Sequence, residues 1–541
     1  MRKIAFMTAF FVLALAVQNF VFAENNGFII DWSGVAVTGY TGDSGIAVVP
    51  GGVREIAFAP AAGGGTEKIS RLIMPASVTD IAGLSQCTAL AAIDVEADNT
   101  ALKSFDGVLY SKDMTCLIAY PRAKTDAVFI IPESVQKIRM GAVVGNPYLE
   151  SVVFPAGLRE LGTGNFTDCK NLKNLTVPEE NPCYAVAGGL LYSKDGKTLV
   201  LCPGGTSGKT AVKDGTEVIG YGAFSGCGGV TEAVLPESLL SIMTMAFAGC
   251  TGLQSLSLPV GLESINAACF LGCTALETIE AGKSDRYQSV DGILYSRDML
   301  DLILCPPGKA GAVVIPEGVR TVTNGAFDGC AKITEIRLPD SMESAKRAFL
   351  NCTALKYFEV PETQSILDYC MFMGCTEMEW VYLPCNVVII QDRVFAGCNP
   401  VIYCDEDSYA EMYAMEHDMA YRYMVHVTLN NEKVWFDQPP VLEKDAVLMP
   451  IRAVFEALGA AVDWDAETKT VFARNGETQV KITAEEKQML VRQGEITYMV
   501  GLSTPARIEN GRMLVPLRAV SEAFLAEVNW DAKTKTVRIE K

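Results

Sequence analysis

The sequence predicts a repeat solenoid of parallel β-strands, followed by a small duplicated α+β domain. Two different periods in the 541-residue chain indicate this organisation. Prolines recur every 22 or 23 residues, and cysteines keep step with them, as Pro236 and Pro259 or Cys227 and Cys250 show. Near the C-terminus two segments align at an offset of 66 residues. A period of roughly 20–50 residues is typical of stacked structural units, each of which buries its apolar face against its neighbours.

Each repeat begins with Phe-x-x-Cys, continues into a short strand that ends in proline, and returns through a second apolar segment. In "GLQSLSLP" the pattern points Leu253, Leu256 and Leu258 inward, and proline ends the strand because it cannot donate to the ladder. The return segment "LESINAACF" is expected to turn Ile265 and Phe270 into the same core. One period therefore predicts one coil of the solenoid.

The chain has 17 cysteines, and nine of them occupy the repeat position: Cys87, Cys169, Cys227, Cys250, Cys273, Cys330, Cys352, Cys375 and Cys398. Equivalent side chains one coil apart hold their Cβ atoms about 4.8 Å apart, whereas a disulfide prefers roughly 3.8 Å. No Cys-x-x-Cys pair suggests zinc or redox chemistry. The pattern favours free, buried cysteines that act as small hydrophobes and weak S–H donors, with disulfides as the alternative.

Three segments interrupt the period and predict strand–turn–strand hairpins, with turns at Lys112-Asp113, Asp195-Gly196 and Arg297-Asp298. The second segment contains "GGTSGKT", which is similar to a phosphate-binding loop. That motif requires glycine where this chain has Pro203. Lys209 aligns in this interpretation with Lys124 and Lys309 of the sister segments as a turn lysine. We therefore expect no nucleotide cofactor.

From about residue 28 to residue 424 these features resemble the BspA-like leucine-rich repeats (LRR_5 type) of bacterial surface proteins. The segment "VTGYTGDSGIAVVPGGV" is similar to the opening cap of that family, and "DSYAEMYAMEHDMAYRYM" is similar to its closing helix. The resemblance implies a leucine-rich-repeat β-solenoid with a parallel strand ladder and hairpin insertions. It also implies a protein of the bacterial cell surface.

The C-terminal duplication pairs "DAVLMPIRAVFEALGAAVDWDAETKTVFA" with "NGRMLVPLRAVSEAFLAEVNWDAKTKTVRIE". In each half a proline, Pro450 or Pro516, is expected at the first helical position, and Gly459 is expected to end the first helix. The helix is followed by a strand–turn–strand segment. Trp464 and Trp530 repeat at equivalent strand positions, which favours a role as hydrophobic anchors of the core. A pair of sugar-stacking rings is the alternative.

This region resembles the N-terminal-like domain of copper amine oxidases. The copper and quinone of that family belong to a separate catalytic domain, whose metal is held by histidines. The present chain has two histidines, His417 and His426, both near the domain junction. We therefore expect no copper, no other metal or cofactor, and no amine oxidation.

The N-terminus predicts a signal peptide at residues 1–23, because Arg2 and Lys3 precede the apolar segment Ile4–Val17. A transmembrane anchor is the alternative. The expected domains are then the leucine-rich repeat domain with its cap and closing helix at residues 24–424, and the copper amine oxidase N-terminal-like domain at 425–541. We expect a secreted or cell-surface bacterial protein without membrane insertion after signal removal.

The composition and the motifs argue against several functions. The formal net charge is −19, from 64 acidic and 45 basic residues, and such a chain repels the phosphates of nucleic acid. No serine nucleophile elbow and no recognisable pair of catalytic carboxylates is present. We therefore predict a protein that is not an enzyme, with no catalytic residues, while a hydrolase or redox enzyme with an unrecognised site stays the third possibility.

The strand alternation places two outward side chains on each coil, and the last coils turn aromatic rings outward. Exposed aromatics beside charges are typical of a recognition surface. The candidate ligand-binding residues are Glu335, Arg337, Tyr357, Glu359, Trp380 and Tyr382. In the alternative, the closing helix or the C-terminal module covers Tyr357, Trp380 and Tyr382.

The resulting prediction is an exported, non-enzymatic binding or adhesion protein that acts as a monomer. Its expected partner is an extracellular protein or polysaccharide. A structural cell-envelope protein anchored through its C-terminal module is the alternative.

Overall fold

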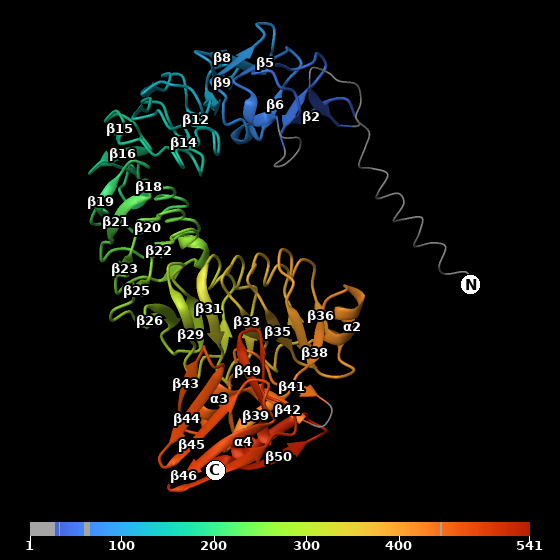
Figure 1. Cartoon of the computed structure of the whole chain (residues 1–541). Helices are drawn as coiled ribbons and strands as arrows, with labels where there is room; N and C mark the ends of the chain where they lie inside the picture. The colour runs from blue at the N-terminus through green and yellow to red at the C-terminus, as the bar shows by residue number, and fades with distance from the viewer. Residues whose placement is uncertain (1–26, 32, 59–64, 444–445) are drawn as a thin grey trace. The chain divides into compact units, whose positions relative to one another are not determined.

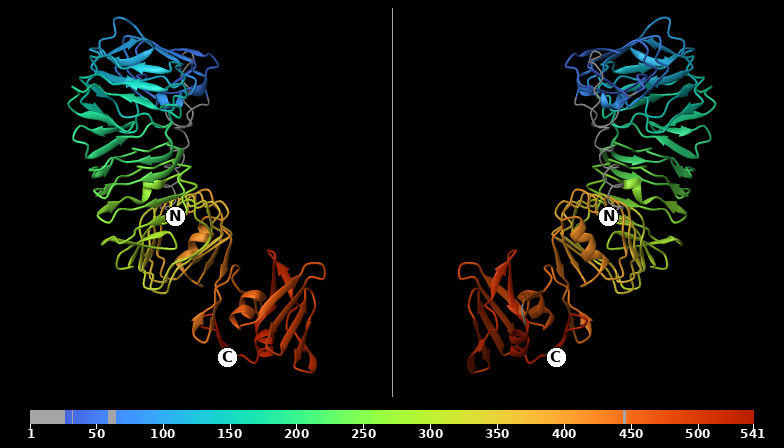
Figure 2. Two further views of the ribbon diagram at one scale, coloured as in Figure 1. Left: turned by 90° about the vertical axis from the view of Figure 1, so that its left-hand side faces the viewer. Right: turned by 90° about the vertical axis from the view of Figure 1, so that its right-hand side faces the viewer.

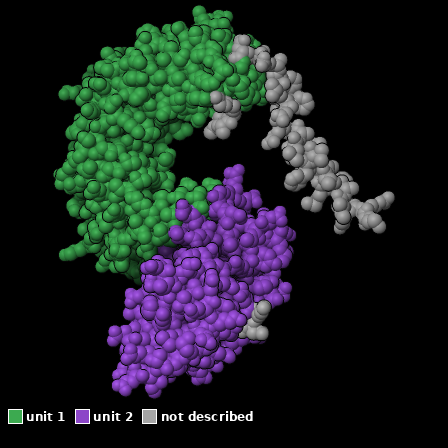
Figure 3. Space-filling view, in the orientation of Figure 1, with its two compact units in different colours: residues 1–334, 339–354, 370–376 green, residues 335–338, 355–369, 377–541 purple. Residues whose placement is uncertain are grey.

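The computed structural model describes residues 27–31, 33–58, 65–443 and 446–541, so the expected signal peptide lies outside the described residues. The chain divides into two compact units (Figure 3). The first comprises residues up to 334 together with 339–354 and 370–376. The second comprises residues 335–338, 355–369 and 377–541.

The first unit contains parallel ladders in which one strand follows another along the stack (Figures 1 and 2). Ser151 pairs with Asn174, and Leu256 pairs with Ile279, each at a separation of one repeat. The prediction that one period is one coil is therefore confirmed. The ladder strands are β3 (Ile46–Val48), β5 (Arg71–Met74) and β7 (Ala92–Val95); β11 (Val128–Ile130), β13 (Ser151–Val153) and β15 (Asn174–Thr176); and β19 (Ser207–Ala211), β21 (Gly229–Val234), β23 (Ser255–Ser257) and β25 (Thr278–Glu280). The unit also contains β29 (Ala310–Val314).

The return segments form a second series of short parallel strands. These are β12 (Lys137–Ile138) and β14 (Glu160–Leu161); β20 (Val218–Ile219), β22 (Ser241–Ile242) and β24 (Ser264–Ile265); and β30 (Thr321–Val322) and β32 (Ser344–Ala345). At the N-terminal end, β1 (Phe28–Ile30) pairs antiparallel with β2 (Ala36–Tyr40), which leads by parallel pairing to β4 (Glu55–Ala57) and β6 (Asp80–Ala82).

The three interruptions each contain three antiparallel strands rather than a two-stranded hairpin. They are β8 (Leu102–Phe105), β9 (Val108–Ser111) and β10 (Cys116–Ala119); β16 (Tyr184–Ala187), β17 (Leu190–Ser193) and β18 (Thr198–Leu201); and β26 (Tyr287–Val290), β27 (Ile293–Ser296) and β28 (Asp301–Leu304). The expected turns separate the second and third strands. The third strand of each set then continues by parallel pairing into the return series.

The prediction that Lys209 is a turn lysine is wrong. The backbone N–H groups of Lys124 and Lys309 close turns by donating to the carbonyls three residues earlier. The equivalent turn in the second interruption is closed by Thr206. Lys209 lies three residues further along, on β19, where it forms an ion pair of 2.7 Å with Glu232. The extra residues of "GGTSGKT" displace it from the turn.

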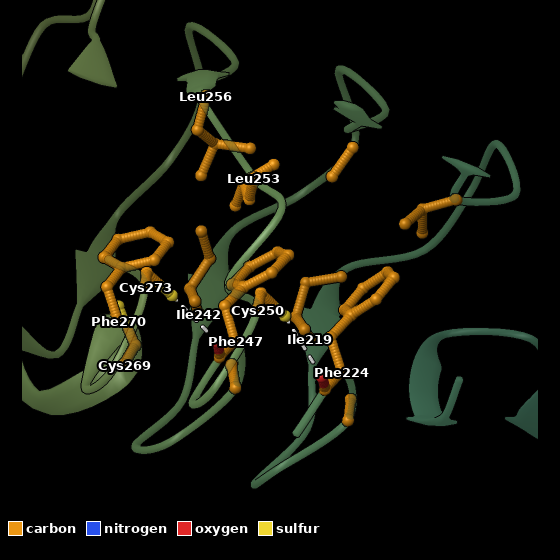
Figure 4. Packing of buried hydrophobic residues seen from close by; sticks show 14 of the residues in the cluster. Ile219, Phe224, Ile242, Phe247, Cys250, Leu253, Leu256, Cys269, Phe270 and Cys273 are labelled. Carbon is orange, nitrogen blue, oxygen red and sulfur yellow. Dashed lines mark hydrogen bonds between the residues drawn. The ribbon is translucent and has the colours of Figure 1, made fainter. Parts of the chain in front are cut away.

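The repeated phenylalanines and cysteines form two columns in the core of the first unit (Figure 4). The ring of Phe247 stacks on Phe224 at 4.8 Å and on Phe270 at 5.4 Å between centroids. The thiol of Cys250 donates to the carbonyl of Phe224 at 3.1 Å, and that of Cys273 donates to Phe247 at 3.0 Å. Each of these two thiols thus adds a second donor to a carbonyl of the preceding coil, which also accepts from a backbone N–H.

All 17 cysteines lie within the described residues, and none of them forms a disulfide there. Eight of the nine repeat cysteines are buried, and Cys398 is half-buried. Burial raises the pKa of Cys87 to about 12 and the pKa of Cys169 to about 11, so both thiols stay protonated at neutral pH. The prediction of buried cysteines acting as apolar fillers and weak donors is confirmed.

The second unit contains the outer strands of the last coils. In one ladder β33 (Tyr357–Glu359), β35 (Trp380–Leu383), β37 (Val401–Cys404) and β38 (Tyr421–Tyr423) are parallel, and β34 (Ile366–Leu367) pairs with β36 (Ile389–Ile390). The strand β31 (Lys332–Arg337) enters this unit at Glu335. The expected closing helix is α2 (Tyr409–Glu416). Its N-cap Ser408 accepts from the Glu411 N–H, and the Glu411 carboxylate accepts from the Asp407 N–H, in a variant of the capping box.

The C-terminal module consists of three sheets and two helices around one core. One sheet contains β40 (Glu432–Lys433), β39 (His426–Leu429), β51 (Thr536–Glu540) and β50 (Glu527–Asp531). Another contains β41 (Val441–Glu443), β42 (Ala446–Pro450), β49 (Arg512–Pro516) and β48 (Arg507–Glu509). The third contains β43 (Ala461–Asp465), β44 (Thr470–Asn475), β45 (Thr478–Thr483), β46 (Gln488–Gln493) and β47 (Ile496–Gly501).

The duplication is visible in the order of elements, because β42, α3 (Ile451–Ala457), β43 and β44 correspond to β49, α4 (Leu517–Ala523), β50 and β51. Pro450 and Pro516 stand one residue before the position expected, as N-caps of these helices. Gly459 follows the first helix at φ +78°, as expected, and the equivalent residue of the second half is Leu525 at φ +61°.

The expectation that Trp464 and Trp530 anchor the core of the module is wrong. Their side chains are 42% and 37% exposed. Trp464 lies opposite Val471, and Trp530 lies opposite Val537, one residue pair before the turn of each hairpin. Each tryptophan is thus at the rim of its sheet, on an edge strand.

Candidate functional site

The six candidate ligand-binding residues all belong to the second unit, and the structure separates them into two groups. Trp380 and Tyr382 are buried, so for these two rings the covered alternative holds. Glu335, Arg337 and Tyr357 line a cavity, and Glu359 forms an ion pair with Lys433. The alternation did identify side chains that point away from the solenoid core. It could not show that the C-terminal module covers some of them.

Trp380 joins the ladder to the C-terminal module. Its indole N–H donates to the carbonyl of Asp437 at 3.1 Å. Its ring stacks on Tyr357 at 5.2 Å and 6° between planes, and it meets Tyr403 edge-on at 5.7 Å. A buried tryptophan whose N–H has a partner stabilises an interface rather than serving a ligand from solution.

Tyr382 lies at the centre of a polar cluster next to the first strand of the module. Its hydroxyl is 3.1 Å from a carboxylate oxygen of Glu362, 3.4 Å from one of Asp405 and 3.4 Å from the Nε2 atom of His426. Burial raises the pKa of Tyr382, and these carboxylates raise it further. Burial lowers the pKa of His426, with Lys433 contributing in the same direction. At neutral pH the hydroxyl is therefore protonated and the imidazole neutral.

The cavity has a volume of about 940 Å³, within the range typical of ligand pockets. One wall comes from the ladder and holds Glu335, Arg337 and Tyr357. The opposite wall comes from the module and includes residues of β40, α3, β43 and β49. Residues that are distant in sequence are thus brought together around one hollow.

Ion pairs line this cavity. Arg337 pairs with Glu335, whose other oxygen accepts from the Tyr357 hydroxyl at 2.8 Å. Arg512 pairs with Asp437 at 2.7 Å. On α3, Arg452 and Glu456 lie 3.9 Å apart. The lining contains four basic and four acidic side chains in all, so it carries many hydrogen-bonding groups and no net formal charge.

Aromatic rings stand among these ion pairs. Trp464 lines the cavity with much of its side chain exposed, and Trp435 lines it with Lys433 placed over its ring at 4.2 Å from the centroid. Four further lining residues were not expected from the sequence: Lys433, Trp435, Arg452 and Arg512. One signal was available in the sequence, because Trp464 and Arg452 both recur 66 residues later. In the structure neither of these two residues is buried.

Metal-ligating side chains do not cluster in the described residues. These residues contain no group of three or more His, Cys, Asp and Glu side chains placed to hold a metal ion. The Nδ1–H group of His417 donates to the carbonyl of Tyr413 at 2.9 Å, and its ring stacks on that of Tyr413, while His426 faces Tyr382. The two histidines therefore do not form the ligand set that copper would need.

The stacked coils, the parallel ladders and the cavity beside the last strands define a leucine-rich-repeat β-solenoid joined to a duplicated α+β module. Residues 126–184, 209–296 and 309–404 match the BspA type leucine rich repeat region in six copies. Residues 428–539 match the copper amine oxidase N-terminal domain. The chain therefore contains BspA-type leucine-rich repeats and a copper amine oxidase N-terminal domain.

Several solved structures are similar to this chain. A leucine-rich cell surface protein from Faecalibacterium prausnitzii is 20% identical, with a TM-score of 0.36 over 73% of this chain and 97% of that chain. A leucine-rich repeat protein from Eubacterium ventriosum is 23% identical, with a TM-score of 0.31 over 47% and 71%. One from Bacteroides ovatus is 17% identical, with a TM-score of 0.25 over 75% and 98%. No curated protein matches the chain.

The repeat family is one of bacterial surface proteins, and the matched C-terminal domain is a part of copper amine oxidases that does not carry their catalytic centre. Within the described ranges, no helix combines the length and the apolar character that a membrane crossing requires.

Proposed function

We propose that this chain is an exported, non-enzymatic bacterial surface protein that binds an extracellular glycan in the cavity beside its last ladder strands. The observation that carries the proposal is the lining of the cavity. Exposed Trp464 stands among paired charges, and the described residues contain no metal-ligand cluster. Such a lining offers a stacking face and hydrogen-bonding groups to a ligand.

The lining favours a neutral sugar over a charged polymer. A tryptophan face packs against the apolar C–H face of a sugar ring. The donors of Arg337 and Arg512 and the acceptors of Glu335 and Asp437 are fixed by their mutual pairing, so they can also bond hydroxyl groups without prior ordering. Because the opposite charges balance, neither a polyanion nor a polycation gains net attraction from the site.

The proposal is tested by presenting the chain from residue 24 to arrays of extracellular glycans and proteins. We expect capture by a neutral glycan, and a loss of at least about tenfold in affinity for Trp464→Ala, because aromatic anchors dominate such contacts. Trp530→Ala is the matched control, since Trp530 is the equivalent residue of the second half and does not line the cavity. Glycan capture that survives Trp464→Ala, or capture by proteins alone, would contradict the proposal.

Anchoring through the C-terminal module is a second candidate, and the exposed ring of Trp530 favours it. In that case the full chain should sediment with isolated cell-wall polysaccharide, and Trp530→Ala should reduce the sedimented fraction while Trp464→Ala leaves it unchanged. The two tryptophan variants therefore separate the two candidates.

A further inference from the structure

The strand β47 forms one edge of the five-stranded sheet in the C-terminal module. Its sequence is ITYMVG, with no charged residue and no proline. Five of its six residues are exposed, among them Ile496 at 69% and Met499 at 53%. It pairs with β46 through all six residues without a bulge. Because each edge strand directs the N–H and C=O groups of alternate residues away from its sheet, β47 offers a regular, unpaired hydrogen-bonding edge.

The other sheet edges of the module are different. Charged side chains on an edge strand are a common means of preventing edge-to-edge pairing. Each of the other five edge strands among the described residues carries at least one: Glu432 and Lys433 on β40, Glu527 and Asp531 on β50, Glu443 on β41, Arg507 and Glu509 on β48, and Asp463 and Asp465 on β43. Among these six edge strands of the described module, β47 alone therefore lacks a charged side chain.

We propose that β47 pairs antiparallel with β47 of a second copy of this chain, which extends the sheet across a two-fold axis. The faces of the strand limit the register. Tyr498 lies opposite the buried Val491 of β46, so Ile496, Tyr498 and Val500 share the face toward the module core. A two-fold axis perpendicular to the sheet places the core-facing sides of both copies on the same side of the extended sheet. Directly opposed residues must therefore come from the same face of the strand.

Two registers satisfy this condition and pair five residues of each strand. The first opposes Tyr498 to Tyr498 of the second copy, and Ile496 to Val500. Aromatic and β-branched residues then meet across the two strands, and such cross-strand pairs stabilise antiparallel pairing. The second places Gly501, which has no side chain, opposite Thr497. We assign the first register. It continues the apolar face of the sheet without interruption.

Charge also selects a second copy of the same chain as the partner. In the assigned register the nearest charged residue, Glu495, lies opposite Gly501 of the second copy, so no like charges meet. The opposite edge of the same sheet could not pair with itself in this way, because Asp463 and Asp465 of β43 would face aspartates. A contact of two short strands buries less area than a stable interface requires, so the dimer is weak and depends on concentration. The monomer expected from the sequence is then the form at low concentration.

The test is sedimentation velocity on the chain from residue 24 over a hundredfold range of concentration. We expect the mass to rise from monomer toward dimer. Tyr498→Lys opposes two like charges at the axis and should weaken dimerisation at least tenfold. Leu490→Lys, an exposed position on the neighbouring strand β46, is the matched control and should dimerise like the wild type. An equimolar mixture of Tyr498→Lys and Tyr498→Glu should dimerise again, because the opposed charges then attract.

A covalent probe fixes the register. Tyr498→Cys should form a disulfide-linked dimer under mild oxidation, whereas Thr497→Cys, which faces Met499 of the second copy, should not. Circular dichroism and thermal unfolding confirm that each variant is folded. The proposal is overturned by a wild type that stays monomeric over the whole range, by dimers that persist equally in Tyr498→Lys, or by a Lys–Glu mixture that stays monomeric. Capture of an extended peptide at Tyr498 by a monomeric chain would also overturn it.

Discussion

The coils of the first unit and the two halves of the C-terminal module are both sequence repeats, yet their repeated residues have opposite environments. In the coils the recurring Phe247 and Cys250 are buried, and each packs against its counterpart in the neighbouring coil. In the module the recurring Trp464 and Trp530 are exposed at the rims of separate sheets. Repetition along a stack places every set of equivalent residues in contact, whereas the duplication around one core leaves these two tryptophans in different sheets.

This difference has a physical basis in the packing. The coils above and below each coil cover its apolar side chains, so equivalent positions in successive coils are buried to the same extent. The halves of the module share a single core, in which β42 pairs with its equivalent β49, whereas the equivalent strands β43 and β50 lie in separate sheets. Equivalent residues there need not meet. A recurring large residue in a duplicated module is therefore weak evidence for the core.

The largest expected effect tests the buried column. Phe247→Ala removes a ring that stacks on both Phe224 and Phe270, and the cavity left behind cannot collapse between two ordered coils. We expect the free energy of unfolding of the first unit to fall by about 3–5 kcal/mol, measured by denaturant titration. Ser255→Ala, an exposed change in the same coil, should have almost no effect. A negligible change for Phe247→Ala would remove the contrast between the two kinds of repeat.

The same contrast explains what could be predicted from the sequence. The coil period predicted the inward leucines and the cysteine column, and strand alternation predicted the turns at Lys112-Asp113 and its two counterparts. The closing helix was expected from the resemblance to the repeat family. The cavity could not be predicted, since Arg337 and Trp464 meet only through the packing of the module on the ladder. Burial of Trp380 was missed for the same reason. Periodicity states which way a side chain points but not what covers it.

An intermediate effect tests the hydrogen bonds of the cysteine column. Cys250→Ala removes one donor to the buried carbonyl of Phe224 together with one sulfur atom. The carbonyl of Phe224 keeps the Cys227 N–H as a donor, so the expected loss of stability is about 1–2 kcal/mol, from the lost S–H···O bond and a small void. Cys385→Ala is the control, because Cys385 is exposed. Titration of the unfolded, unreduced chain should also yield all 17 thiols, and paired losses among the repeat cysteines would contradict the free column.

A smaller effect compares the two halves of the module at one backbone position. Gly459 ends α3 at φ +78°, and Leu525 ends α4 at φ +61°, a conformation that costs a residue with a Cβ atom roughly 1–2 kcal/mol. The Leu525 side chain is 80% exposed, so its removal sacrifices little packing. Leu525→Gly should therefore stabilise the module by up to about 1 kcal/mol in thermal unfolding. Leu525→Ala retains the Cβ atom and should bring no such gain.

The smallest effect is expected at Trp530, and its size decides whether the two repeats really differ. A tryptophan in a core costs about 3–5 kcal/mol when it is replaced by alanine, whereas surface changes stay within about 0.5 kcal/mol. Since Trp530 stands at the rim of its strand pair, opposite Val537, Trp530→Ala should fall near the surface value in denaturant titration of the full chain. A loss near the core value would mean that recurrence marks burial in the module as it does in the coils. A small loss leaves both exposed tryptophans to be explained by what they bind.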